Sequence, residues 1–258
     1  GDDGTIYVAW DDERPPFNYI QVYFSKSTDG GLTFTPDVLV NDTAGGLMDR
    51  PHSDPCMAVD TSGVIYIAFD DGRNGPGNYD IYFSKSTDGG LIFTPDVMVN
   101  DTVPGDSLDD IMPALALSQD DDIYVSWSKE YDSLYVSKST DGGITFSPDV
   151  LVNDTVVESW MNTMDVDARG YVHIAWFDGR DGMYNIYYSR STDGGLTFSA
   201  NIQLNDTVNE PETQGYPSMC VDDSGMVYAV WENGPATEPD IYFTLSTDTG
   251  DSSFVEPN

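Results

Sequence analysis

Basic residues are scarce in this sequence of 258 residues. Ten Lys and Arg stand against 45 Asp and Glu, which gives a formal net charge of −35. Nucleic acid and anionic membrane surfaces bind proteins through a basic footprint, so the sequence excludes nucleic acid as a partner and disfavours a membrane surface. The sequence also lacks any apolar run of about 18 residues, so we expect no membrane span.

Cysteine, histidine and glutamate are scarce as well. The two cysteines, Cys56 and Cys220, are too few for a disulfide scaffold, and we expect both to be buried thiols. The two histidines match no metal-ligand spacing, and no Ser/His/Asp pattern, phosphate-binding glycine loop or CxxC pair is visible. Glu occurs eight times, so the acidity comes mainly from 37 Asp. With 39% hydrophobic residues, the chain is too apolar for a disordered acidic tail.

What the sequence does contain is an internal repeat of about 55 residues. The segment STDGG occurs at 27–31, 86–90, 139–143 and 191–195, and a weaker copy, STDTG, follows at 246–250. The repeats span approximately 1–50, 51–108, 109–158, 159–212 and 213–258. A repeat of this length suits one four-stranded blade of a β-propeller.

Each repeat contains four short runs with the composition of β-strands, such as 55–60, 65–69, 80–84 and 146–152. We therefore expect an all-β fold, in which residues 1–258 form a single β-propeller domain of four-stranded antiparallel blades. The first repeat begins at its second strand, and the last stops before its fourth strand is complete. This predicts incomplete terminal blades, either in a fragment of a parent protein for which six blades are possible, or completed by another segment or subunit. An unpaired sheet edge favours self-association.

The turn pattern Ser-x-Asp-x-Gly-x-Thr-Phe is met in full at 27–34, 139–146 and 191–198, whereas Ile92 replaces Thr in the second copy. The pattern resembles the Asp-box, or BNR, repeat of the sialidase-like β-propeller superfamily. The resemblance implies a propeller fold, with these turns on the face opposite the substrate pocket, and we expect a secreted or cell-surface protein. The expected structural residues of the five turns are Ser27, Asp29, Gly31, Ser86, Asp88, Gly90, Ser139, Asp141, Gly143, Ser191, Asp193, Gly195, Ser246, Asp248 and Gly250.

The turn has a physical interpretation of its own. An Asp carboxylate can accept hydrogen bonds from nearby backbone N–H groups, and Gly permits a positive φ. The aromatic residue that follows can pack back onto the blade. We therefore expect a structural role for these residues.

Candidate catalytic residues are few. A sialidase-like site would need an arginine cluster for a carboxylate, a Tyr–Glu pair and an acidic proton donor. Arg14, Arg73 and Arg180 recur after the second strand of their repeats, and Glu130 and Glu232 lie at the ends of second strands, with no obvious Tyr partner in the sequence, so these residues are weak candidates. The alternative is that each Arg forms an ion pair with the Asp of its own loop.

The triplet Asn-Asp-Thr follows the fourth run in four repeats. It is a formal N-glycosylation acceptor, and the alternative is a structural turn. The glycosylation candidates are Asn41, Asn100, Asn153 and Asn205. The adjacent carboxylates suit Ca²⁺, although a solvated acidic surface is the alternative. The candidate calcium ligands are Asp42, Asp101, Asp154 and Asp206; no cofactor is required.

The leading functional hypothesis is a non-catalytic extracellular or surface propeller that acts as a structural scaffold or binding module. The hypothesis includes self-assembly of the chain through its open terminal blades. Blades as uniform as these favour a structural array over an enzyme with one asymmetric site. The runner-up is an exo-acting glycoside hydrolase of sialidase type. A third hypothesis is a carbohydrate-binding module with glycans as partners. Trp160 stands outside the repeat pattern and is the candidate for ligand stacking, whereas the other four Trp end second strands and are expected in the core.

Overall fold

The computed structural model describes residues 1, 3–14, 20–42, 52–74, 77–101, 108–180, 182–205, 214–234, 240–246 and 254–255. These residues form antiparallel β-sheets, each within one sequence repeat. The first sheet has three strands, β1 (Ile6–Glu13), β2 (Ile20–Ser27) and β3 (Val38–Leu39). The second contains β4 (His52–Val59), β5 (Ile65–Asp71), β6 (Asp80–Ser86) and β7 (Val97–Met98). The third contains β8 (Asp110–Leu117), β9 (Ile123–Lys129), β10 (Ser133–Ser139) and β11 (Val150–Leu151).

The remaining described strands form two further four-stranded sheets. The fourth sheet contains β12 (Ser159–Val166), β13 (Val172–Asp178), β14 (Asn185–Ser191) and β15 (Ile202–Gln203). The fifth contains β16 (Gln214–Val221), β17 (Val227–Asn233), β18 (Asp240–Ser246) and β19 (Phe254–Val255). No helix in the described part of the chain has the length and apolar character needed to cross a bilayer.

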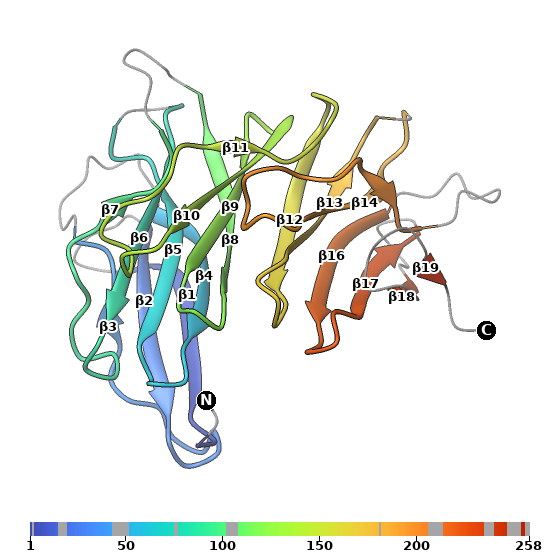
Figure 1. Ribbon diagram of the computed structural model, residues 1–258. Coiled ribbons are helices and arrows are strands. Elements are labelled where there is room, and N and C mark those ends of the chain that lie inside the picture. Colours follow the sequence, from blue (N-terminus) through green and yellow to red (C-terminus); the bar gives the residue numbers. More distant parts are fainter. Residues whose placement is uncertain are drawn as a thin grey trace.

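The sheets follow one another in chain order, from the first (blue) to the last (red) in Figure 1. Strand β4 contacts β1 and β8, and β12 contacts β8 and β16, so the first strands of successive four-stranded sheets lie side by side. Each sheet is a simple meander of hairpins. These features are those of propeller blades, and the expected all-β class and three-stranded first sheet are confirmed. The last sheet has four strands, and its fourth strand is as long as those of the internal sheets, so the expectation of an incomplete last blade was wrong.

The fourth strand of each sheet is shorter than the sequence predicts. The run 146–152 was expected to be one strand, but only Val150 and Leu151 pair with β10. Pro148 has no N–H to donate to a ladder, and a single backbone bond from Ser147 N to Lys138 O (2.8 Å) holds the segment before it. The prediction of a full fourth strand was therefore wrong.

The hydrophobic core lies between successive sheets. One face of β5, with Ile65, Ile67 and Phe69, is completely buried against the first sheet, where it meets Phe24. Alternate residues of the same strand face the third sheet, because side chains of a strand alternate between its two faces. Every internal sheet is therefore apolar on both faces, which explains the near-continuous apolar second strands in the sequence.

Three of the four tryptophans expected in the core are buried there. Trp127, Trp176 and Trp231 are at most 1% exposed, whereas Trp10 lies on the first sheet, in the face turned away from the second, and is only half-buried. Both cysteines are free thiols. Cys56 is partly buried but Cys220 is exposed, so the expectation of a buried thiol was wrong for Cys220.

The first strand of each four-stranded sheet carries a bulge. The register shifts near its start, and the residue at the shift has a positive φ although it is not glycine. These residues are Asp54, Met112, Met161 and Tyr216, with φ between 47° and 55°. A left-handed conformation costs a non-glycine residue about 1–2 kcal/mol, so the repeat maintains this strain in four places.

Candidate functional site

The STDGG turns have the local structure that the sequence predicts. In the first turn, Asp29 accepts the backbone N–H of Thr33 (2.9 Å) and the Thr33 hydroxyl (2.6 Å), while Ser27 Oγ accepts the N–H of Gly31 (2.9 Å). The same bonds recur around Asp141 and Asp193. The Thr hydroxyl and the N–H donors lower the pKa of each of these carboxyls to about 2. Asp248 and Gly250 lie outside the described residues.

The turn also joins one sheet to the preceding sheet, which the sequence analysis did not predict. Phe93 packs edge-on against Phe24 of the first sheet (5.4 Å between centroids), and Phe146 packs in the same way against Phe83 (5.4 Å). A Cβ on Gly90 would overlap the Phe24 ring. The expectation that the aromatic residue packs onto its own blade was therefore wrong, because the preceding sheet supplies the partner.

The three recurring arginines are bound in ion pairs. Arg73 pairs with Asp71 of its own loop, as one sequence hypothesis stated, and also with Asp96 (2.5 Å) and with Asp42 of the preceding sheet (3.3 Å). Its guanidinium lies 3.8 Å from the centroid of the Tyr82 ring.

The other two arginines repeat this arrangement. Arg180 pairs with Asp178 and Asp154 at 2.7 Å each, and Arg14 pairs with Asp12 and Asp37. The geometry therefore gives these side chains a structural role between strands and sheets, and it does not place them in a shared pocket.

The Asp residues proposed as calcium ligands form pairs of reciprocal hydrogen bonds between neighbouring sheets. Asp42 N donates to Asp96 Oδ2 (3.0 Å), and Asp96 N donates back to Asp42 Oδ2 (3.1 Å). Asp101 with Asp149, and Asp154 with Asn201, are joined in the same reciprocal way. No group of three or more acidic, His or Cys ligands gathers among the described residues. These bonds do not favour calcium at the three Asp; Asp206 lies outside the described part.

The four Asn of the Asn-Asp-Thr triplets are buried. They are 1–7% exposed, and each Oδ1 accepts a backbone N–H, at 2.8–3.0 Å, from the strand that precedes the STDGG turn of its repeat. Each Nδ2 also donates a hydrogen bond. Asn100 Nδ2, for example, donates to Asp80 and Asp110 at 2.8 Å. A glycan would need an accessible Nδ2, so this geometry argues against glycosylation of Asn41, Asn100, Asn153 and Asn205. The structural alternative fits the four positions.

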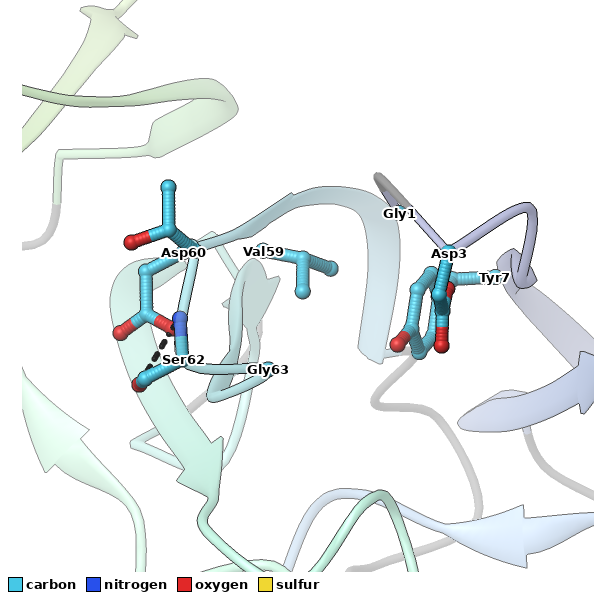
Figure 2. A pocket seen from close by; sticks show the side chains of 8 residues that line it. Gly1, Asp3, Tyr7, Val59, Asp60, Ser62 and Gly63 are labelled. Atoms are coloured by element: carbon cyan, nitrogen blue, oxygen red, sulfur yellow. Dashed lines mark hydrogen bonds between the residues drawn. The ribbon is translucent and has the colours of Figure 1, made fainter.

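A pocket of about 270 Å³ lies between the start of the chain and the β4–β5 turn, with Asp3 and Tyr7 on one side and Val59–Gly63 on the other. Figure 2 shows Asp60 bonded to Ser62 within its turn, across the pocket from Tyr7. Asp60 also accepts the Tyr66 hydroxyl (2.9 Å), and Asp3 accepts the N–H of Thr5 (2.9 Å). The pocket's carboxylates thus hold the turns, and we do not assign it as the functional site.

A row of aromatic side chains lies at the end of the third and fourth sheets away from the STDGG turns. Tyr131 and Tyr184 are in loops there, whereas Trp160 is near the start of β12 and Phe177 near the end of β13. Tyr131 meets Trp160 edge-on (6.0 Å), Trp160 meets Phe177 (5.1 Å), and Phe177 stacks on Tyr184 (4.2 Å). We call Tyr131, Trp160, Phe177 and Tyr184 the aromatic row. Tyr131 is 45% exposed, Trp160 and Tyr184 are half-buried and Phe177 lies beneath them.

A strained turn holds Tyr131 in this row. Glu130 and Tyr131 connect β9 to β10 with φ of 53° and 60°, and Asp132 N closes the turn on Lys129 O (3.1 Å). Two left-handed central residues define a type I′ turn, which normally uses Asn-Gly. Tyr131 O accepts the N–H of Ser159 (2.7 Å), so the loop is fixed to the start of β12 beside Trp160. Strain of this kind is typical of functional positions.

Carboxylates surround the aromatic row. Glu158 Oε2 accepts the hydroxyl proton of Tyr184 (2.7 Å), and Glu130 Oε1 accepts the N–H of Asp109 (2.7 Å). The bond to Glu158 raises the pKa of Tyr184. Burial raises the pKa of Tyr131, and the neighbouring Asp109 and Asp70 raise it further, so the phenol is neutral at physiological pH. The indole N–H of Trp160 is buried and has no hydrogen-bond partner in the described part of the chain.

The candidate Glu232 lies elsewhere. It sits in β17, paired with Gly215 and Ile241, and no tyrosine among the described residues donates to it. The Tyr–Glu pair that is present, Tyr184 with Glu158, was missed in the sequence because its members are 26 residues apart on different elements. Trp160, which the sequence analysis named as the candidate for ligand stacking, is part of the aromatic row, and the candidate Glu130 lies beside it.

Comparison with known proteins gives matches in structure only. No family model matches the sequence, and no curated protein matches it. Among solved structures, a Dyadobacter fermentans protein of unknown function matches with a TM-score of 0.68 and 17% identity, over 99% of this chain and 80% of that one.

Two carbohydrate-active enzymes are also similar. The NanB sialidase of Streptococcus pneumoniae has a TM-score of 0.66 and 11% identity, over 98% of this chain and 58% of that chain. An ulvan lyase from a family of polysaccharide lyases has a TM-score of 0.69 and 14% identity, over 100% and 67% respectively. This chain therefore spans little more than half the length of that sialidase. At such low identities the likeness is one of fold, and the fold of this chain is that of a sialidase-like β-propeller.

Proposed function

We propose that this chain is a non-catalytic glycan-binding module, and that the aromatic row is its binding surface. The observation that carries the proposal is the strained Glu130–Tyr131 turn, which presents an exposed tyrosine beside Trp160. Flat aromatic rings stack on the apolar C–H faces of sugar rings, and phenol groups add polar contacts at their edges. The similarity in fold to a sialidase and an ulvan lyase supports a carbohydrate-related role.

The charges near the row favour a neutral glycan over an anionic one. Glu130, Glu158 and Asp109 border the aromatic rings and can accept hydrogen bonds from sugar hydroxyls. The arginines of the neighbouring loops are bound to Asp, so none of Arg14, Arg73 and Arg180 is available to a sugar carboxylate. The net charge of −35 adds a repulsive field against a polyanion.

Affinity electrophoresis in gels that contain one polysaccharide each tests this proposal. We expect neutral glucans, xylans or galactans to retard the protein, and Trp160→Ala or Tyr131→Ala to abolish the retardation. Tyr171→Ala is the matched control, because Tyr171 immediately precedes β13, at the end of the sheet away from the aromatic row, and contacts Arg169. Thermal unfolding of each variant shows whether the fold is kept.

Two outcomes would count against the proposal. If no polysaccharide, neutral or anionic, retards the protein, or if both row variants bind as well as the unsubstituted chain, the aromatic row is not a binding surface. Retardation by anionic polysaccharides alone would contradict the expected preference for a neutral glycan. The same two variants would then show whether the anionic glycan binds at the aromatic row. We propose a secreted or cell-surface location with this function, where such glycans are accessible.

The second candidate function is an exo-acting glycoside hydrolase of sialidase type. The specific observation in its favour is the 2.7 Å bond between Tyr184 and Glu158, since a carboxylate in this position can take the phenol proton. A fluorogenic sialoside tests it: turnover that disappears with Tyr184→Phe would establish the enzyme. Absence of turnover at high protein concentration would leave the binding module as the better hypothesis.

A further inference from the structure

Internal sheets dock on one another through a recurring aromatic contact. In the first sheet, the rings of Tyr7 and Phe24 lie 6.2 Å apart, and Phe93 of the second sheet packs against Phe24. Tyr66 and Phe83 receive Phe146 of the third sheet in the same way.

The fourth sheet has the same contact with the fifth. Here His173 and Tyr188 lie 6.0 Å apart, and Tyr188 receives Phe254 at 5.2 Å. A receiving face and an inserted phenylalanine are therefore the two halves of one repeated interface.

Among the described strands, no sheet packs against the inserting face of the first sheet. Ile6 and Val8 are 40% and 37% exposed, whereas the equivalent Ile65 and Ile67 of the second sheet are completely buried. Phe34, the equivalent of Phe93, is 48% exposed. This face has the composition of an internal interface and the exposure of a surface.

The last sheet has the complementary receiving face. The rings of Tyr228 and Phe243 lie 6.5 Å apart, at the positions that Tyr7 and Phe24 hold in the first sheet, where the rings are 6.2 Å apart. Ile241 is 70% exposed, although its equivalent Val22 is completely buried. Val230, in the same face, is 37% exposed.

We propose that the inserting face of one copy of this chain docks on the receiving face of a second copy. In this head-to-tail contact, Phe34 of one copy packs against Phe243 of the next, as Phe93 packs against Phe24 within the chain. The occupant is a second copy because the chain itself carries both halves, in matching register. A contact between two different faces of identical chains leaves one face of each kind free, so it builds rings or open chains of copies.

Two features set the strength of this contact. Lys85 donates to Gly142 O of the next sheet (2.6 Å), but the last sheet has Leu245 at the equivalent position and lacks this hydrogen bond. Each copy also carries a net charge of −35, which repels other copies at low salt. The association is therefore apolar, and it strengthens with salt, because the screening length falls from about 10 Å at 0.1 M to about 3 Å at 1 M.

Sedimentation equilibrium over a range of concentrations, in 0.1 M and 1 M sodium chloride, tests the proposal. We expect the average mass to rise above 28.3 kDa with concentration, and to rise further in 1 M salt. Phe34→Asp and Ile241→Asp should each reduce the protein to monomers. Leu196→Asp is the matched control, because Leu196 is 68% exposed but lies on neither face, and it should assemble normally.

Mixing the two monomeric variants separates this contact from a symmetric one. Phe34→Asp keeps an intact receiving face and Ile241→Asp keeps an intact inserting face, so the pair should form a 1:1 dimer and stop there. A chain that stays monomeric at every concentration and salt would overturn the proposal. So would variants that assemble as well as the unsubstituted protein, or a mixture that stays monomeric.

Discussion

At the scale of single residues, the aspartates fall into two environments with opposite effects. The STDGG aspartates are exposed and accept several local N–H and O–H groups, which hold their pKa near 2. Asp70 and Asp110 are buried, and burial raises the pKa of each to about 7. The sequence predicted the first environment because all partners lie within four residues. It did not predict that Arg73 also pairs with Asp96, since 23 residues separate them.

The second STDGG turn provides a test of the hydroxyl contribution. Ile92 stands where Thr33, Thr145 and Thr197 donate to the other aspartates, and Asp88 receives only backbone N–H groups and Ser86. We expect Ile92→Thr to lower the pKa of Asp88 further, because the new hydroxyl can donate to the carboxylate as the Thr hydroxyls do in the other turns. Titration of the Asp88 carboxyl by nuclear magnetic resonance measures this.

Leu91→Thr is the control for this prediction, because Leu91 is as exposed as Ile92 but precedes the position of the donating hydroxyl. It should leave the pKa of Asp88 where it is. An Asp88 carboxyl that titrates identically in the parent and in Ile92→Thr would mean that the hydroxyl contributes nothing.

At the scale of elements, the strands were predictable but their partners were not. The second and third strands have β-branched and aromatic residues on both faces, which marks them as buried. The fourth strand was overestimated because Pro148 interrupts the ladder. The aromatic row could not be predicted, since Tyr131 and Trp160 meet only when the third and fourth sheets are placed side by side.

The second glycine of the STDGG turn is expected to be sensitive to substitution. Gly143 has φ of 83°, and a Cβ there would overlap the Phe83 ring of the preceding sheet. Gly63 has a similar φ of 85° with open space around it. Gly63→Ala should cost about 1–2 kcal/mol of unfolding free energy for the left-handed backbone, and Gly143→Ala about 1–3 kcal/mol more for the overlap. Denaturant unfolding that gives equal losses would contradict this role of Gly143.

The ion pairs of Arg73 and Arg14 are also expected to differ in energy. Arg73 pairs with Asp71 and Asp96, whose side chains are completely buried. Arg73→Ala leaves these carboxylates without their charge partner, and we expect a loss of about 3–5 kcal/mol of unfolding free energy. Arg14 pairs with exposed Asp12 and Asp37, so Arg14→Ala should leave stability almost unchanged. The denaturant midpoints of Arg73→Ala and Arg14→Ala, each compared with that of the unsubstituted protein, measure this difference. Equal losses would contradict the distinction between a buried and an exposed ion pair.

At the scale of the whole molecule, stability should decrease from pH 5 to pH 8. The folded-state pKa of about 7 for Asp70 and Asp110 is above the ordinary value of 3.8, so these groups bind protons more tightly in the folded chain. Their contribution is complete below pH 4 and is lost as the pH rises through 7. The STDGG aspartates act in the opposite direction, and their contribution is lost only as the pH falls through about 2.

Denaturant unfolding at pH 5 and pH 8 measures this difference. We expect a higher unfolding free energy at pH 5, and a smaller difference between the two pH values in Asp70→Asn, which cannot take up the proton. A protein that gains stability from pH 5 to pH 8 would show that other groups dominate.

Much of the whole-molecule arrangement was predictable, because a repeat of about 55 residues with four strand-like runs determines a series of similar sheets. The contacts between sheets are similar from one pair to the next. Phe93 packs on Phe24, and Phe254 packs on Tyr188. Between the third and fourth sheets, Val136 takes the place of the receiving ring, in the cluster that Phe198 packs against. This uniformity has a consequence for the history of the chain. A duplicated repeat arrives with one face that fits its predecessor and one that fits its successor, so a gene can gain or lose a whole repeat without any compensating substitution.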